Sequence, residues 1–211
     1  AANQLSFIEN EPCPVISGNV SFYNESKEGN AVIPSPVIVC IGKMSDYRKA
    51  IHMQIKKEDC QLICIGNRYA EFSATEISPY LSGAIGPAPQ VRFEQESNQN
   101  KVVHHLIDNQ MIEACHDISK GGLWICLTDM LFGERSVPQV SAAIDLTVFK
   151  SLEVALFSEN GGYLIAVPNE KIADVSAILS DRSIDHYTIG KTVKSSDLSI
   201  DFNKASYHFD L

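Results

Sequence analysis

The sequence predicts an α/β (α+β) protein in which a mixed sheet is layered with helices. Short apolar runs alternate along the chain with stretches of helical spacing, in the order β, α, β, α, β, α, β. Gly, Pro, Asn and Asp punctuate these runs, as expected at the ends of elements. The 211 residues are 45% hydrophobic and 20% charged, which suffices for one core, or for one domain plus a piece of another.

Residues 1–42 are predicted to be the tail end of an incomplete N-terminal-type domain. Residues 14–24 read as a strand, residues 27–30 (KEGN) as a turn, and residues 36–42 as a continuous apolar strand. Two strands alone are only marginally stable. We therefore expect the rest of their sheet to lie elsewhere, and we assign residues 43–211 to a second domain.

The second domain carries the alternating elements. Ser45 is a candidate N-cap for a short helix, residues 61–66 read as a buried strand, and the pair Pro168-Asn169 signals a helix start. In order, the predicted elements are a helix over 45–50, a strand over 61–66, a helix over 73–81, a loop over 83–89, a helix in the second half of 90–112, a strand over 114–116, a helix over 121–132 with an apolar face, strands over 140–146 and 162–167, a helix over 169–181, and strands over 184–192 and 197–202.

Charge and composition exclude several classes of function. The net charge is −9, from 17 basic and 26 acidic residues, and no basic cluster is longer than Lys56-Lys57, so we expect no nucleic-acid partner. The sequence contains no run of 18 apolar residues, so it predicts no membrane-spanning helix. Residues 1–10 do not resemble a signal peptide. Five of the six cysteines lie in or beside apolar runs, as free thiols do in a reducing compartment, which predicts a cytoplasmic protein without a zinc site.

The segment PVISGNVSFYNES at residues 14–26 interrupts an apolar strand with small polar residues. Gly18 permits close approach of a second group, and Asn19 and Ser21 supply hydrogen-bond donors. The pattern fits a strand that faces a ligand. It fits equally a β-bulge whose polar residues are satisfied internally.

A second motif, HDISKGG, lies where a short strand turns into a helix. Gly121 and Gly122 in a first helical turn favour bare backbone amides, backed by the positive end of the helix dipole. Such a turn suits a phosphate or the carboxylate of a neighbouring domain. The alternative is a tight turn capped by Asp117 or Ser119, with glycines that allow close packing; in that interpretation His116 is structural and not a proton carrier.

A third motif, ALFSENGGYLI at residues 155–165, places Glu159 between small polar residues and two glycines. The three motifs, in this order, resemble the C-terminal part of the formylglycinamide ribonucleotide amidotransferases, the synthetase subunits of phosphoribosylformylglycinamidine synthase. The resemblance covers about residues 13–193. It places the chain in the aminoimidazole ribonucleotide synthetase superfamily, and implies that residues 43–211 resemble the C-terminal domain of that enzyme.

The resemblance implies a function in purine biosynthesis, the conversion of formylglycinamide ribonucleotide to formylglycinamidine ribonucleotide with ATP, Mg²⁺ and glutamine-derived ammonia. It implies three partners: the N-terminal half of the same enzyme, a glutaminase subunit and a small accessory subunit. Catalytic residues and metal ligands belong to that N-terminal half, so we expect this chain to be inactive alone and to bind no cofactor tightly. For the ribonucleotide phosphate, the expected contacts are Gly18, Asn19 and Ser21, then Asp117, Ser119, Gly121 and Gly122; His116 and Glu159 are expected at an interdomain contact.

The chain also departs from that family. Lys120 stands where relatives often carry an acidic residue, and residues 68–76 (RYAEFSATE) lack the glycines of the family's Gly-Gly-Ser-Glu-like string. We therefore assign no nucleotide binding to residues 68–76. Two alternative functions stay open: an ATP-binding protein like selenophosphate synthetase or the hydrogenase maturation factor, and a non-catalytic docking module for a glutaminase.

Overall fold

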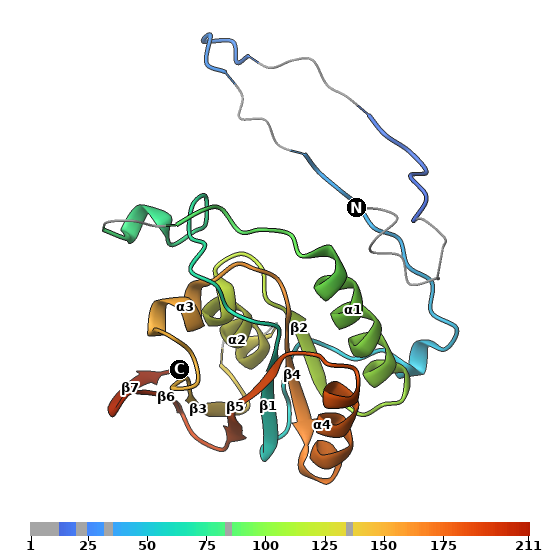
Figure 1. The fold of residues 1–211 in the computed structure, drawn as a ribbon, viewed down its shortest axis with the longest axis vertical. Helices are drawn as coiled ribbons and strands as arrows, with labels where there is room; N and C mark the ends of the chain where they lie inside the picture. Colours follow the sequence, from blue (N-terminus) through green and yellow to red (C-terminus); the bar gives the residue numbers. More distant parts are fainter. Residues whose placement is uncertain (1–12, 20–24, 32–35, 83–85, 134–136) are drawn as a thin grey trace.

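The computed structural model describes residues 13–19, 25–31, 36–82, 86–133 and 137–211, and its body is a mixed sheet with helices on both faces (Figure 1). The described strands are β1 (Cys60–Ile65), β2 (Ala114–Asp117), β3 (Ser141–Asp145), β4 (Tyr163–Pro168), β5 (His186–Val193), β6 (Asp197–Phe202) and β7 (Ala205–Asp210). They form one sheet in the order β2-β4-β1-β5-β3-β6-β7. The β3–β6 pair is parallel, and the other neighbouring strands are antiparallel. The predicted fold class is confirmed.

The helices divide between the two faces. They are α1 (Phe93–Asp108), α2 (Gly122–Phe132), α3 (Leu152–Phe157) and α4 (Ile172–Asp181), with 3-10 turns η1 (Tyr47–Lys49), η2 (Ser78–Tyr80) and η3 (Asn169–Lys171). Side chains alternate along β1, so Leu62 and Cys64 join the core under α2 and α3, whereas Ile63 and Ile65 join the core under α1 and α4. Strand β1 is buried on both faces because it is a central strand, which explains its continuous apolar run.

The amino-terminal residues differ from expectation. A turn over residues 26–30 is confirmed, with the Gly29 amide donating to the Ser26 carbonyl at 3.0 Å and an isolated bridge between Glu25 and Ala31. Residues 36–42 form no strand, and their apolar side chains are exposed, Val37 by 88%. The prediction of a strand there is wrong for this structure, because no described strand lies beside these residues to accept their backbone hydrogen bonds. Residues 14–19 of the other expected strand form no strand and are exposed, and its residues 20–24 lie outside the described residues.

Smaller differences have local causes. The expected helix over 73–81 is only the short η2, since Ala74 has a positive φ of 61° and Pro79 enters at the first turn. Asp46 and not Ser45 caps η1, accepting a hydrogen bond from the Arg48 amide at 3.1 Å. The sequence patterns did not predict α3 or β7. In the part of the chain that is described, no helix is long and apolar enough to cross a membrane.

Candidate functional site

The candidate site is a pocket of about 360 Å³ at one end of the sheet, where the β2–α2 and α3–β4 turns meet the start of α1. Three carboxylate residues line it, together with a hydroxyl, a phenol and amide side chains: Glu96, Asp117, Glu159, Ser119, Tyr163 and Asn160. Among the described residues, no Lys or Arg lines it. Such a lining favours hydroxyl or amino groups of a ligand over a bare phosphate.

The turn at the start of α2 is the first wall of this pocket. The Gly121 amide, which was expected to hold an external anion, donates instead to Oε1 of Glu159 at 2.9 Å. The same oxygen accepts from the Glu76 amide at 2.9 Å. Glu76 in turn forms an exposed ion pair with Lys120 at 2.8 Å. The carboxylate of Glu159 therefore accepts the hydrogen bond from the Gly121 amide that was expected to go to an external anion.

Gly122 is required for packing. Its φ is +69°, and a Cβ at this position would lie 2.4 Å from the carbonyl oxygen of Leu156. No side chain caps α2: Gly121 is the N-cap, and the Gly122 amide donates to the Ser119 carbonyl at 3.0 Å. The glycine pair thus lets α2 approach the end of α3, as the close-packing alternative requires, although neither Asp117 nor Ser119 is the cap.

We expect Glu159→Ala to lower the free energy of unfolding by about 2 kcal/mol, because two backbone amides lose a charged acceptor. Chemical denaturation followed by circular dichroism measures the change. Glu170→Ala, which removes an exposed carboxylate in η3, is the matched control and should change stability by less than about 0.5 kcal/mol. Equal effects of the two substitutions would refute the bridging role of Glu159.

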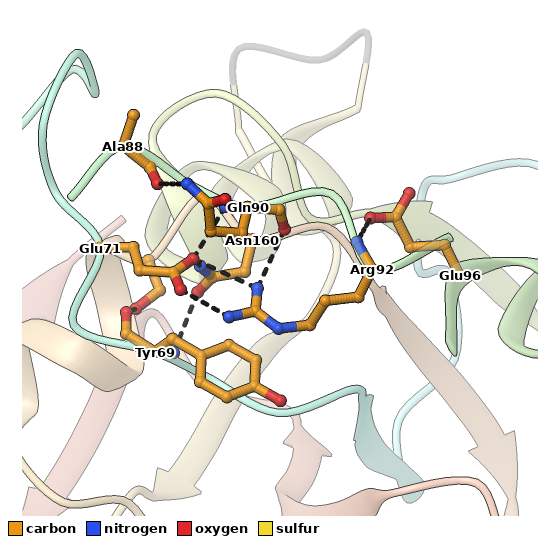
Figure 2. Close-up of polar contacts among 8 residues, drawn as sticks. Tyr69, Glu71, Ala88, Gln90, Arg92, Glu96 and Asn160 are labelled. Carbon is orange, nitrogen blue, oxygen red and sulfur yellow. Dashed lines mark hydrogen bonds and ion pairs between the residues drawn. The ribbon is translucent and has the colours of Figure 1, made fainter. Parts of the chain in front are cut away.

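A second wall is held by a network around Glu71 and Arg92, shown in Figure 2. The Arg92 guanidinium contacts both carboxylate oxygens of Glu71, the closer at 2.5 Å, and lies 3.7 Å above the centre of the Tyr69 ring. The backbone amide of Gln90 and Nδ2 of Asn160 also donate hydrogen bonds to Oε2 of Glu71, at 2.9 and 2.8 Å. Hydrogen bonding from Arg92, above all, holds the pKa of Glu71 below its ordinary value. The network ties residues 69–71 and 90–92 to the loop before β4.

Asn160 is the centre of this connection. Its Oδ1 accepts from the Tyr69 amide at 2.9 Å while its Nδ2 donates to Glu71 (Figure 2). The hydroxyl of Ser158 donates to the Tyr69 carbonyl at 2.6 Å. The loop that carries Glu159 is therefore fixed on both sides of that residue, which presents its carboxylate to the pocket in one orientation.

The titratable groups around β2 provide no activated nucleophile. Burial raises the pKa of the Cys115 thiol to about 12, so it is protonated at neutral pH. Burial also raises the pKa of Tyr163 to about 12, and its hydroxyl donates to Oδ1 of Asn100 at 2.6 Å. His116 lies 3.1 Å from Asp117 and 3.7 Å from Asp129, measured between ring nitrogen and carboxylate oxygen. These three side chains form a local carboxylate–histidine cluster between β2 and α2.

The structure brings together only part of the predicted site. Asp117, Ser119 and Glu159 line the pocket, Gly121 and Gly122 begin the adjoining helix, and His116 precedes it on β2. Gly18 and Asn19 lie in an exposed segment and do not line the pocket; among the described residues, no atom beyond Gly18 and its two chain neighbours lies within 4 Å of a Cβ placed on Gly18. Ser21 lies outside the described residues. A role in binding ribonucleotide phosphate stays a prediction for all seven residues.

Sequence reasoning missed Glu71, Arg92 and Asn160. Glu71 and Arg92 pair across an intervening turn and loop, and no local pattern marks them as partners. Asn160 is adjacent to Glu159 in the third motif, so its position was indicated although its role was not. Within the described residues, no group of three or more His, Cys, Asp or Glu side chains is arranged to hold a metal ion.

Comparison with known proteins agrees with this fold. A curated phosphoribosylformylglycinamidine synthase subunit PurL from Methanothrix thermoacetophila is 34% identical over 195 residues, covering 90% of this chain and 24% of the relative. Its counterpart from Caldanaerobacter subterraneus subsp. tengcongensis is 34% identical over 192 residues, covering 90% and 25%. The chain thus spans about a quarter of the length of the curated relatives that it matches.

Solved structures share the fold. Thermotoga maritima PurL complexed with FGAR matches with a TM-score of 0.64 at 7% identity, over 78% of this chain and 29% of that one. The same protein complexed with ATP matches with a TM-score of 0.61 at 7% identity, over 78% and 27%. The family profile described as "AIR synthase related protein, C-terminal domain" matches residues 62–203. The chain therefore belongs to the AIR synthase related proteins, and residues 62–203 are their C-terminal domain.

Proposed function

We propose that this chain is the C-terminal part of a phosphoribosylformylglycinamidine synthase synthetase subunit. The enzyme would convert formylglycinamide ribonucleotide to formylglycinamidine ribonucleotide with ATP and glutamine-derived ammonia. The observation that supports this most is the 34% identity, over 90% of the chain, to curated proteins of that name. Solved structures of similar fold, namely Thermotoga maritima PurL with ATP, the same protein with FGAR, and PurLQS from that organism, are consistent with it.

In this proposal the chain supplies one wall of the substrate site. The pocket beside α2 offers carboxylate, amide and hydroxyl groups, which suit the hydroxyl and amide groups of a ribonucleotide. ATP, Mg²⁺ and the reacting groups would be held by parts of the enzyme beyond these residues, and the chain alone should have no activity. The glutaminase and a small accessory subunit would be separate partners, in the reducing cytoplasm.

The size of the native polypeptide tests the proposal first. Immunoblotting of source cells with an antibody to this domain should detect a band at well over twice the mass of this chain. Purified protein of that size should then convert formylglycinamide ribonucleotide when supplied with ATP and ammonia. A band at the mass of this chain alone would instead support a free-standing docking module, which would bind a glutaminase without any dependence on nucleotide.

The amino-terminal motif gives a second prediction. In the intact enzyme, the double replacement Gly18→Ala with Asn19→Ala should raise the KM for the ribonucleotide about tenfold, because backbone access and a side-chain donor to the phosphate are both lost. The circular dichroism spectrum and melting temperature should not change. The exposed pair Lys27→Ala with Glu28→Ala, in the neighbouring turn, is the control. Unchanged kinetics in a folded double variant would exclude this motif from the substrate site.

A further inference from the structure

Arg68 is a buried cation without a carboxylate partner among the described residues. It follows β1, is only 9% exposed, and donates from Nη2 to the carbonyl oxygen of Gly161. Its Nε and Nη1 are buried and have no hydrogen-bond partner in the described structure. A guanidinium stays charged at any physiological pH, so burial leaves this charge uncompensated. Arg92, by contrast, has its ion pair with Glu71.

The surroundings of Arg68 are rich in hydrogen-bond donors. Arg68 and Arg92 line the same small cavity of about 10 Å³, together with the amide side chains of Gln95 and Gln99. Glu96 is the one carboxylate in the described lining, and its Oε1 accepts from the Arg92 amide at 3.2 Å. The charge of Arg92 is already paired with that of Glu71, so Arg68 is the guanidinium of this cavity that has no ion pair among the described residues.

The cavity adjoins the larger pocket. Both are lined by Glu96, Gln99, Asn160 and Gly161. At about 10 Å³ the small cavity has room for one water molecule, so an oxyanion enters only when a lining side chain moves. Gln95 lines the cavity and is exposed, so we expect its displacement to open a path to the Arg68 guanidinium.

We propose that Arg68 is the anchor of an oxyanion site at the edge of this pocket, which binds a phosphate or carboxylate group of a ligand. The anion supplies the acceptors that Nε and Nη1 lack and neutralises the buried charge. A ligand whose hydroxyl groups lie among the carboxylates of the larger pocket can place its anionic group here.

Thermal unfolding of the full chain tests the proposal, with inorganic phosphate or acetate compared against chloride at equal ionic strength. Phosphate at about ten times its Kd should raise the melting temperature of the wild type by about 3–5 °C. Arg68→Met should weaken phosphate binding at least about tenfold. In chloride this variant should be as stable as the wild type or more stable, because an uncompensated charge is gone. Gln95→Ala should strengthen binding by opening the entrance.

The matched control is Arg182→Met, which removes an exposed arginine that does not line the cavity. It should respond to phosphate like the wild type. A melting temperature that rises with phosphate alone would identify a phosphate site. A melting temperature that rises with both phosphate and acetate would identify a general oxyanion site. Equal rises in all variants, or no rise with either anion, would overturn the proposal. If Arg68→Met does not fold, wild-type crystals soaked in phosphate decide: an anion bonded to Nε or Nη1 supports the site, and water there refutes it.

Discussion

Gly162→Ala is expected to lower the free energy of unfolding by about 3–5 kcal/mol, from a strained φ and a steric clash acting together. Gly162 has a φ of +99°, and an added Cβ would lie 2.3 Å from the carbonyl oxygen of Ile65 and 2.7 Å from Nη2 of Arg68. The Ile65 carbonyl belongs to β1, whose position is fixed by strands on both sides. The backbone cannot yield without loss of sheet hydrogen bonds.

Gly161 provides the control one residue earlier. Its φ is +82°, but the atom nearest to an added Cβ is 3.8 Å away, in the side chain of Glu96. Gly161→Ala should therefore lower the free energy of unfolding by about 1–2 kcal/mol, from backbone strain alone. Urea unfolding followed by circular dichroism measures both variants. Equal losses for the two alanines would contradict the close approach of β1 to this loop.

Glu71→Gln is expected to destabilise the fold by about 2–3 kcal/mol at neutral pH. The substitution removes the charge that pairs with Arg92 and leaves that guanidinium, whose side chain is 25% exposed, without its carboxylate. The Gln90 amide keeps an acceptor only if the new amide group is oriented correctly. Glu94→Gln, an exposed residue in the first turn of α1, is the control and should cost less than about 1 kcal/mol.

The effect of Glu71 should depend on pH. Its pKa is lower in the folded chain than in the unfolded chain, so its ionised form stabilises the fold. This stabilisation is complete above the unfolded pKa and is lost as the pH falls through the folded pKa. Below about pH 5, wild-type stability should therefore decline more steeply than that of Glu71→Gln. Parallel curves for the two proteins from neutral pH to about pH 3 would show that Glu71 does not contribute through its charge.

Much of the fold of residues 60–210 could be predicted from sequence because its signals are local. The apolar run of β1 and the repeating apolar positions of α2 indicate the type of each element without reference to any other. Element ends also follow local rules: β4 ends at Pro168, and α2 is followed by Gly133. Short elements such as α3 and β7 escaped because they carry too little periodicity to stand out.

The candidate site was only partly predictable. The motifs predicted Asp117 and Ser119 as substrate-binding residues and Glu159 as an interdomain contact. The structure brings all three to one pocket, because β2 pairs with β4 and the end of β2 therefore lies beside the start of β4. The motifs did not show that the Glu159 carboxylate would accept a hydrogen bond from the Gly121 amide, since the two residues lie on separate turns, remote from each other in sequence. An interdomain role for Glu159 and His116 stays a prediction.

The sequence by itself determined the type and order of most elements and the family of the chain, because periodicity and motif spacing are properties of neighbouring residues. Tertiary structure decided which polar groups meet. Pairing β1 with β4 brought the loop at 158–162 against residues 66–76. In that arrangement Asn160 donates a hydrogen bond to Glu71, whereas Nε and Nη1 of Arg68 have no hydrogen-bond partner in the described structure. Hydrogen bonds and buried charges depend on distances between segments remote in sequence, and folding alone sets those distances.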